Sequence, residues 1–359
     1  IIPRRFCRYG ISPDEFRVRL KEIPVPDIVF LTTLMTYWYT GVRETVEEIK
    51  KVFKDTPVIT GGLYSTILPE HALKNTGVDG VYQGPVENGL EAFLYTFGFR
   101  LKRKRAPQPY WELGLLKWDF APLRTSTGCP FRCTYCASGL FYNEFKQREP
   151  DEIIKEIMTF YNLGIKDFAF YDDALLVRSE KHIKPVMKEI IKKSLHLRFH
   201  TPNGLHARFI DDELARLMNE SGFMTVRVSL ETVSSELQEK TGGKVKTDEF
   251  KRAIETLKRA GFTKKELGVY LMLGLPGQGL NDVIEGVKFL KSLDVRIHLT
   301  EFSPIPGTPL WNEMVTSGII PEDMDLLLTN NSVFYYLFSG YDIKRLEALK
   351  LEVKGYNES

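Results

Sequence analysis

The feature that most constrains the fold is a regular exchange of short apolar segments with longer amphipathic segments. Strands are predicted at 123–127, 167–171, 196–201, 224–230, 267–273 and 296–301. Predicted helices lie between them at 151–162, 179–193, 211–220, 247–260 and 279–292. Six such units favour one parallel sheet, and a complete TIM barrel has eight. We therefore predict an α/β protein in which residues 121–310 form an open, partial (β/α)6 barrel of the TIM type.

Residues 1–98 show the same alternation on a smaller scale. Strands are predicted at 28–31, 58–60 and 78–82, with helices at 41–53, from residue 69 and at 87–97. This order favours an open, doubly wound, Rossmann-like sheet. Three strands are few for such a sheet, and the chain begins with Ile1, so we expect this domain to be incomplete at its N-terminus.

Two further segments complete the predicted organisation. Residues 99–120 begin with a basic, proline-containing stretch, which we interpret as a solvated linker rather than a contact with nucleic acid. Residues 311–359 are predicted to form a helical C-terminal segment that packs on the barrel.

Charge and cysteine content limit the classes of function. The net charge is +2, and no apolar run is long enough to span a bilayer. We expect a cytoplasmic protein without a membrane span or a nucleic-acid partner. Four cysteines in 359 residues do not suggest a disulfide scaffold, and Cys7, far from the other three, is interpreted as a lone thiol.

The other three cysteines, Cys129, Cys133 and Cys136, fall within eight residues on a loop after the first barrel strand. Three thiolates at these spacings can converge on one face of a cubic iron–sulfur cluster, which normally has four cysteine ligands. One iron would then remain open to a substrate or cofactor. A structural zinc site closes with four ligands, and no fourth Cys or His lies at short spacing. A non-enzymatic cluster or zinc protein remains the alternative from another class.

The Cys-x3-Cys-x2-Cys spacing resembles the signature of the radical S-adenosylmethionine (SAM) family, and the resemblance extends over nearly all of residues 121–310. It implies a [4Fe-4S] cluster on the three cysteines and SAM on the open iron. It also implies reductive cleavage of SAM to a 5′-deoxyadenosyl radical, with an electron donor such as flavodoxin or ferredoxin. Tyr135 matches the position whose backbone meets the adenine of SAM.

Further SAM contacts are predicted at the carboxyl ends of barrel strands, where sites lie in parallel α/β folds. The candidate residues are Asp172, Asp173, Ser229, Glu231, Gly274 and Leu275. The aspartates have the alternative role of capping a turn or helix. Alternation places Arg227 on the face of Ser229 and Glu231, so a salt bridge from Glu231 to Arg227 is the alternative there. Asn203 and Arg208 are weaker candidates for the cavity, and all six histidines are interpreted as structural.

Residues 24–98 resemble the cobalamin-binding domain that precedes many radical SAM enzymes. The resemblance rests on a strand, a helix, a Gly-Gly loop after the second strand, and a Gly-Pro-Val-Glu segment where Gly-Glu-Gly-Glu is usual. No Asp-x-His-x-x-Gly motif is present, so no histidine is offered as a lower ligand to cobalt. The implied cobalamin-binding residues are Gly61, Gly62, Ser65, Thr66, Gly84 and Glu87.

These resemblances lead to one principal hypothesis and one rival within the same class. The first is cobalamin-dependent methylation of an unactivated carbon in a small molecule, lipid or peptide, because a hydrogen-abstracting cofactor and a methyl carrier would act together. The second is a radical SAM rearrangement, cyclisation, oxidation or sulfur insertion, with or without cobalamin. No motif identifies the substrate or a catalytic residue.

Overall fold

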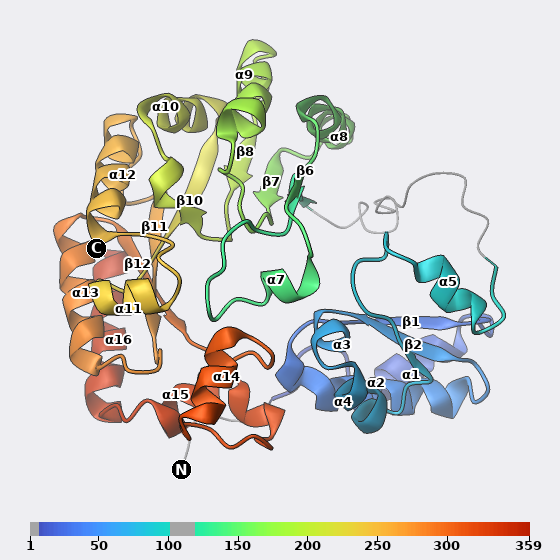
Figure 1. Ribbon diagram of the computed structural model, residues 1–359. Coiled ribbons are helices and arrows are strands. Elements are labelled where there is room, and N and C mark those ends of the chain that lie inside the picture. The colour runs from blue at the N-terminus through green and yellow to red at the C-terminus, as the bar shows by residue number, and fades with distance from the viewer. Residues whose placement is uncertain (1–6, 101–118) are drawn as a thin grey trace. The chain divides into compact units, whose positions relative to one another are not determined.

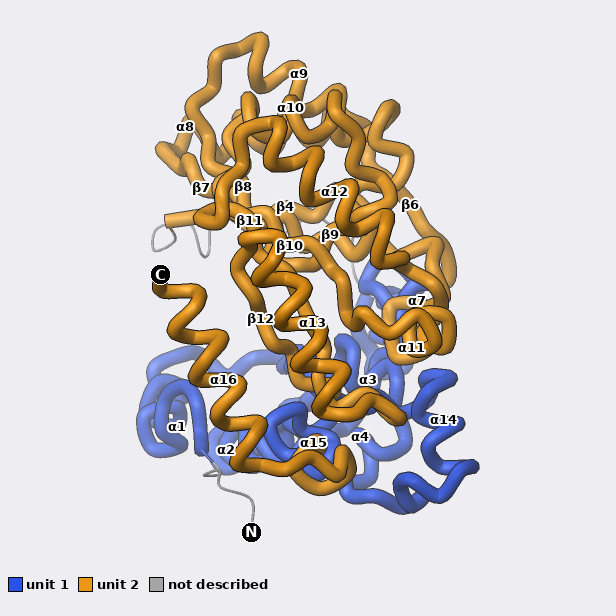
Figure 2. Tube along the Cα trace, turned by 90° about the vertical axis from the view of Figure 1, so that its left-hand side faces the viewer, with its two compact units in different colours: residues 1–109, 140–142, 303–333 blue, residues 110–139, 143–302, 334–359 orange. Residues whose placement is uncertain are grey.

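The computed structural model describes residues 7–100 and 119–359, and the predicted linker lies largely outside this range. The chain divides into two compact units (Figure 2). Unit 1 comprises residues 1–109, 140–142 and 303–333, and unit 2 comprises residues 110–139, 143–302 and 334–359. The segment 303–333 thus groups with the N-terminal residues, whereas the sequence analysis assigned it partly to the barrel and partly to the C-terminal segment.

Unit 2 contains a parallel sheet with the strand order β12-β11-β10-β8-β7-β4, and a short strand β9 pairs with β10 (Figure 1). The sheet does not close, which confirms the predicted partial barrel. Its strands are β4 (Phe120–Leu123), β7 (Asp167–Phe170), β8 (Arg198–His200), β9 (Leu205–His206), β10 (Phe223–Glu231), β11 (Leu267–Leu273) and β12 (Arg296–Glu301). The helices that alternate with them are α8 (Pro150–Asn162), α9 (Ile183–Lys192), α10 (Asp212–Ser221), α12 (Thr247–Arg259) and α13 (Leu280–Ser292).

The helices of unit 2 cover one face of this sheet. Alternate residues of β11 point toward them, and a Cβ added to Gly286 of α13 would lie 2.8 Å from Leu271. The same face carries the fully buried Val226 and Val228 of β10 and Val269 of β11. Burial of these β-branched and leucine side chains against the helices is the main source of stability for the sheet.

The first predicted barrel strand, at 123–127, is split in the structure. Strand β4 ends at Leu123, and the chain then forms β5 (Ser126–Thr127), which pairs antiparallel with β6 (Lys146–Gln147). The backbone N–H of Thr125 donates to the carboxylate of Asp172 at 3.0 Å instead of extending the parallel ladder. This side-chain acceptor accounts for the end of the parallel strand before Thr125, earlier than predicted.

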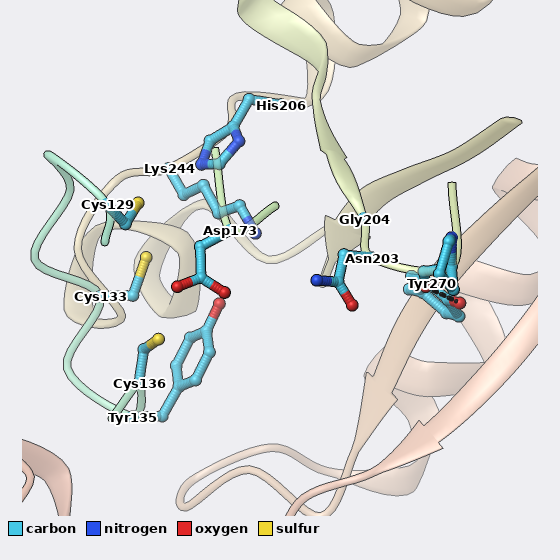
Figure 3. A pocket seen from close by; sticks show the side chains of 11 residues that line it. Cys129, Cys133, Tyr135, Cys136, Asp173, Asn203, Gly204, His206, Lys244 and Tyr270 are labelled. Carbon is cyan, nitrogen blue, oxygen red and sulfur yellow. Dashed lines mark hydrogen bonds between the residues drawn. The ribbon is translucent and has the colours of Figure 1, made fainter. Parts of the chain in front are cut away.

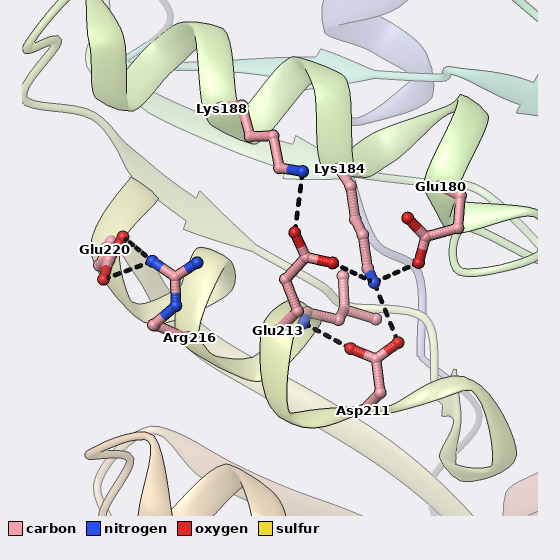
Figure 4. A network of polar contacts seen from close by, with 8 residues as sticks. Glu180, Lys184, Lys188, Asp211, Glu213, Arg216 and Glu220 are labelled. Carbon is pink, nitrogen blue, oxygen red and sulfur yellow. Dashed lines mark hydrogen bonds and ion pairs between the residues drawn. The ribbon is translucent and has the colours of Figure 1, made fainter.

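A buried lysine connects three elements at the edge of unit 2 (Figure 4). The side chain of Lys184 on α9 is 2% exposed, and its Nζ donates to Glu180, to Asp211 at 3.0 Å and to Glu213 at 2.9 Å. Asp211 also accepts from the backbone N–H of Leu214 at 2.7 Å and so caps α10. The lysine therefore holds the start of α10 against α9.

The C-terminal part of unit 2 is helical, as predicted. It consists of α15 (Asn331–Phe338), which begins in unit 1, and α16 (Ile343–Glu358), whose Leu346, Leu349 and Val353 join the core of the sheet. The remaining short helices of the unit are α7 (Ser138–Phe141), which ends in unit 1, α11 (Ser235–Lys240), and the 3-10 helices η2 (Ser179–Lys181) and η3 (Ala207–Phe209).

Unit 1 is built on a parallel sheet with the order β1-β2-β3, in agreement with the predicted alternation. Its strands are β1 (Val29–Thr33), β2 (Val58–Gly62) and β3 (Gly80–Val81). Its helices are α1 (Pro13–Lys21), α2 (Tyr39–Val52), α3 (Leu63–Ile67), α4 (Pro69–Thr76), α5 (Leu90–Tyr95) and α14 (Pro309–Thr316), with the 3-10 helices η1 (Thr36–Trp38) and η4 (Leu326–Thr329). Val46, Ile49 and Phe53 of the α2 region pack on Val58 and Val78. Within the described residues, no helix has the length and apolar character needed to cross a bilayer.

Candidate functional site

The three clustered cysteines lie on a loop between β5 and α7 in unit 2. The backbone N–H of Cys136 donates to the carbonyl of Cys133 at 3.1 Å, and Thr134 N–H donates to Thr241 O at 3.2 Å. Gly242, with φ +108°, faces this loop, and a Cβ there would lie 3.0 Å from Arg132 O. A glycine at 242 thus lets the segment after α11 support the cysteine loop at close range.

A cavity of about 290 Å³ opens beside this loop (Figure 3). All three cysteine side chains line it, as Figure 3 shows. The other lining residues are Tyr135, Asp173, Pro202, Asn203, Gly204, His206, Lys244 and Tyr270. They come from the ends of several strands and from the loops that follow, which is where a parallel α/β fold places its site.

The side chains that line this cavity can be compared with the ligands that the predicted iron–sulfur cluster requires. In the part of the chain that is described, no three His, Cys, Asp or Glu side chains are grouped as ligands of one metal ion. A cubic cluster makes a different demand, because each thiolate binds a separate iron. Burial raises the pKa of Cys133 to about 11, and burial also raises the pKa of Cys129. Cluster binding would displace these protons, and three soft thiolates lining one cavity fit such a group.

The lining residue Lys244 belongs to a buried ion pair. Its partners Glu231 and Ser229, both predicted as SAM contacts, are not among the residues that line the cavity. Lys244 Nζ lies 3.0 Å from Glu231 Oε1 and 3.3 Å from Ser229 Oγ. Burial lowers the pKa of Lys244, but Glu231, Cys133 and Cys136 together outweigh this effect and keep that pKa above its ordinary value. Burial raises the pKa of Tyr135 well above its ordinary value, and the same carboxylate adds to this shift. The pair therefore presents an ammonium group to the cavity at neutral pH.

The alternative partner predicted for Glu231 does not agree with the structure. Glu231 pairs with Lys244, whereas Arg227 Nη1 donates to the carbonyl of Glu266 at 3.3 Å. The cause is a register shift between Ser229 and Glu231, where β10 carries one residue more than β11. Glu231 has φ +68°, so simple alternation along the strand no longer describes its side chain.

The two predicted aspartates after β7 lie in different surroundings. Asp173 lines the cavity and accepts from Ser138 Oγ at 2.6 Å. Asp172 is buried, and its carboxylate accepts from Thr125 and from Ser126 Oγ at 2.6 Å. Of the two, only Asp173 lines the cavity, while Asp172 binds the segment between β4 and β5 and caps no helix or turn of its own in the described chain.

The predicted contacts at Gly274 and Leu275 are not among the lining residues of the cavity. Gly274, with φ +85°, faces Tyr335, and its N–H donates to Tyr341 OH at 3.0 Å. Leu275 is buried, and its N–H donates to Gln278 Oε1 at 3.3 Å. These backbone groups have protein partners, so their assignment to SAM remains a prediction without support from the cavity.

Five lining residues were not predicted as site residues, namely Pro202, Gly204, His206, Lys244 and Tyr270. His206 is 3% exposed, stacks on Phe131 of the cysteine loop with ring centroids 4.7 Å apart, and its Nε2 has no hydrogen-bond partner among the described residues. Pro202, Gly204, Lys244 and Tyr270 gave no sequence signal, because each becomes relevant only when separate strands and loops are brought together. Asn203 does line the cavity, whereas Arg208 donates to Gly243 O at 2.5 Å instead.

The residues predicted to bind cobalamin lie at the end of β2, in α3 and in the segment after β3 of unit 1. Gly62 has φ +97°, and a Cβ there would collide with the carbonyl oxygen of Thr33. Thr66 Oγ1 donates to Gly62 O at 2.7 Å and accepts from Gly84 N–H at 2.8 Å. Gly61 and Gly84 thus belong to one loop cluster with Thr66.

The two remaining residues of that prediction differ in exposure. Ser65 is fully buried, and its hydroxyl lies 2.9 Å from Thr33 Oγ1, so it connects β1 to the loop. Glu87 is exposed. Their role toward cobalamin remains a prediction.

Comparison with known proteins matches both parts of the chain. The model of the radical SAM superfamily matches residues 123–290, and the model of the B12 binding domain matches residues 6–94. Residues 123–290 therefore form a radical SAM domain, and a B12 binding domain precedes it in the sequence. The predicted cofactors, a [4Fe-4S] cluster, SAM and cobalamin, are those of these two families.

Individual relatives give further information on the class of enzyme. An uncharacterized methyltransferase of Pyrococcus horikoshii is 25% identical over 332 residues, which cover 82% of this chain and 71% of that protein. Anaerobic magnesium-protoporphyrin IX monomethyl ester cyclase of Rubrivivax gelatinosus is 21% identical and is matched over 85% of this chain and 61% of its own length. The chain is therefore a cobalamin-dependent radical SAM enzyme with methyltransferases among its relatives, and the non-enzymatic alternative finds no support.

A solved structure agrees with this assignment at the level of the fold. The radical SAM methyltransferase TsrM from Kitasatospora setae, with cobalamin and a [4Fe-4S] cluster bound, gives a TM-score of 0.70 at 20% identity. The match covers 85% of this chain and 70% of that chain.

Proposed function

We propose that this enzyme transfers a methyl group to an unactivated carbon of a small molecule, lipid or peptide, with cobalamin as the methyl carrier. The observation that carries the proposal is the cavity at which Cys129, Cys133 and Cys136 meet Lys244, in a chain that also has a B12 binding domain. Methyltransferase relatives support the reaction class.

The residues of the cavity have distinct proposed roles. Cys129, Cys133 and Cys136 would hold the cluster, which when reduced supplies the electron that turns SAM into a 5′-deoxyadenosyl radical. Lys244 offers an ammonium group that suits a carboxylate, and Glu231 keeps this ammonium charged in a buried place. Asp173 offers a carboxylate that suits the amino group of SAM.

In unit 1 the Gly61-Gly62 turn, with Thr66 and Gly84, is the proposed site for cobalamin. Because Gly62 allows β1 and the loop after β2 to approach closely, the loop backbone is fixed before any ligand arrives. Cobalamin supplies the methyl group. An electron donor such as flavodoxin or ferredoxin would complete the system.

The second candidate is a radical SAM cyclisation or related rearrangement. The observation in its favour is the match to the cyclase of Rubrivivax gelatinosus over 85% of this chain. The two candidates differ in their products from SAM.

The test is anaerobic purification and reconstitution with iron, sulfide and cobalamin, followed by incubation with SAM and a reductant. Formation of both S-adenosylhomocysteine and 5′-deoxyadenosine supports methyl transfer. Formation of 5′-deoxyadenosine alone, or cobalamin occupancy below about one tenth of the chains, contradicts the first proposal. A Cys133→Ala variant in the same assay provides the background rate.

A further inference from the structure

A group of basic side chains lies on the concave face of the unit 2 sheet, opposite the face that the helices cover. Arg227 of β10 and Arg296 of β12 both stand in register with Gly268 of β11, and His298 stands in register with Tyr270. Residues two apart on a strand share a face, so Arg227, Arg296 and His298 face the same side. We refer to these three residues as the basic cluster.

The basic cluster fills the space in front of Gly268. A Cβ added to Gly268 would lie 2.7 Å from both Arg227 Nη1 and His298 Nε2. Any other residue at 268 would therefore displace one of these nitrogens, and glycine leaves room for them side by side.

The basic cluster lies next to the cysteine cavity. Tyr270 lines that cavity, and its ring centroid is 5.7 Å from that of His298. Tyr270 and Gly268 are two residues apart on one strand, a rise of about 7 Å. A substrate whose reacting carbon sits in the cavity is therefore within reach of the basic cluster through another part of the same molecule.

Among the described residues, no carboxylate pairs with the side chains of the basic cluster. Arg296 Nε and His298 Nε2 are buried and have no hydrogen-bond partner among the described residues. Arg227 Nη1 donates only to a backbone carbonyl, that of Glu266. Within the described chain, the titratable groups that act on Arg227 are the Tyr270 phenol and the Arg296 guanidinium, and neither is a carboxylate.

The pKa values of His298 and Arg227 are consistent with the absence of a carboxylate partner in the described chain. Burial, reinforced by Arg227 and Arg296, lowers the pKa of His298 to about 4, and burial also lowers the pKa of Arg227. Two partly buried guanidinium groups beside each other without an anion are costly, and buried polar groups in native proteins nearly always have partners. A purely structural role accounts for the single bond to Glu266 O but not for the two unpartnered nitrogens.

We propose that Arg227, Arg296 and His298 bind an anionic group of the substrate, a carboxylate or a phosphate. This inference rests on the proposed function for the reacting end of the substrate and adds the chemistry of its distal end. Each guanidinium can bind either anion through two N–H donors, and the imidazole is the third group that can donate to it.

The experiment measures anion binding by the full chain, without SAM or reductant. Inorganic phosphate and acetate are titrated separately at constant ionic strength, with chloride as the reference, by calorimetry and by thermal unfolding. Wild type is compared with Arg296→Gln and with Arg252→Gln, a matched change at an exposed arginine of α12. The two anions distinguish a phosphate-bearing from a carboxylate-bearing substrate.

We expect one of the two anions to raise the Tm of wild type and of Arg252→Gln, with at least tenfold weaker binding by Arg296→Gln. Without added anion, Arg296→Gln should raise the Tm by about 2 °C or more, because it removes an unpaired charge. Equal anion binding by wild type and Arg296→Gln, or no binding of either anion by wild type, overturns the proposal, as does a lower Tm for Arg296→Gln. Because this assay needs no methyl transfer, its failure is distinct from failure of the proposed function.

Discussion

Lys244 Nζ lies 3.0 Å from Glu231 Oε1 at the wall of the cysteine cavity, and the side chains are only 15% and 8% exposed. The two residues come from different elements, since Glu231 ends β10 and Lys244 follows α11. Breaking a pair of this kind leaves an uncompensated charge in a poorly solvated place.

Lys244→Met should lower the free energy of unfolding by about 3 kcal/mol, because the Glu231 carboxylate loses its partner. Urea denaturation of the protein without cofactors measures this change. The matched control is Arg259→Met, which breaks an exposed pair with Asp212 and should change stability by less than about 1 kcal/mol. Equal effects of the two variants would show that the buried pair does not stabilise the fold.

Stability should fall in acid through His182. Burial lowers the pKa of His182 to about 4, below the value of about 6.5 expected in the unfolded chain. The folded state therefore favours the neutral imidazole, so its contribution is complete above pH 6.5 and is lost as the pH falls toward 4. The loss is on the order of 2–3 kcal/mol.

Urea denaturation at several pH values tests this statement. His182→Gln, which keeps a side chain able to bond Thr125, should make the decline between pH 6.5 and 4 less steep, and His298 contributes to the part that remains. The same change at the exposed His196 is the control and should leave the steepness as in wild type. A decline of the same steepness in His182→Gln and wild type would count against His182 as its source.

Gly62 and Gly41 should respond in opposite directions to replacement by alanine. Gly62 has φ +97°, and a Cβ there meets Thr33 O, so Gly62→Ala should destabilise unit 1 by more than about 1 kcal/mol and weaken cobalamin binding. Gly41 lies in α2 with no atom near its Cβ position, so Gly41→Ala should stabilise the protein by up to about 1 kcal/mol. Thermal unfolding and cobalamin absorbance measure both effects, and a neutral Gly62→Ala would remove the argument for a fixed loop.

The barrel could be predicted from the sequence because its strands are buried on the helix-covered face. Val269 and Leu271, for example, belong to an apolar run that no exposed segment would carry. Residues that depart from regular strand geometry could not be predicted in this way. Glu231 follows a bulge and adopts a positive φ, and neither feature has a signal in the surrounding residues.

The candidate site was predictable only where its residues are close together in the sequence. The cysteines are so close that their spacing alone indicates a shared ligand. His206 reaches the cavity from β9 and Lys244 from the segment after α11. Asp172 differs from Asp173 only in the direction that each side chain takes after β7. Such relationships depend on tertiary packing, which a pattern of residue types does not contain.

The three cavity cysteines should be individually necessary for the cluster, whereas Cys7 should not. Because each thiolate binds a separate iron, Cys129→Ala, Cys133→Ala or Cys136→Ala removes one ligand from an already incomplete set. Each variant should lose most of its iron and sulfide after anaerobic reconstitution, together with the broad absorbance of the cluster. Cys7→Ala changes an exposed thiol outside the cavity and should retain wild-type iron content. Full iron loading in any of the three cavity variants would mean that the cluster has other ligands, and the assignment of this cavity would then be wrong.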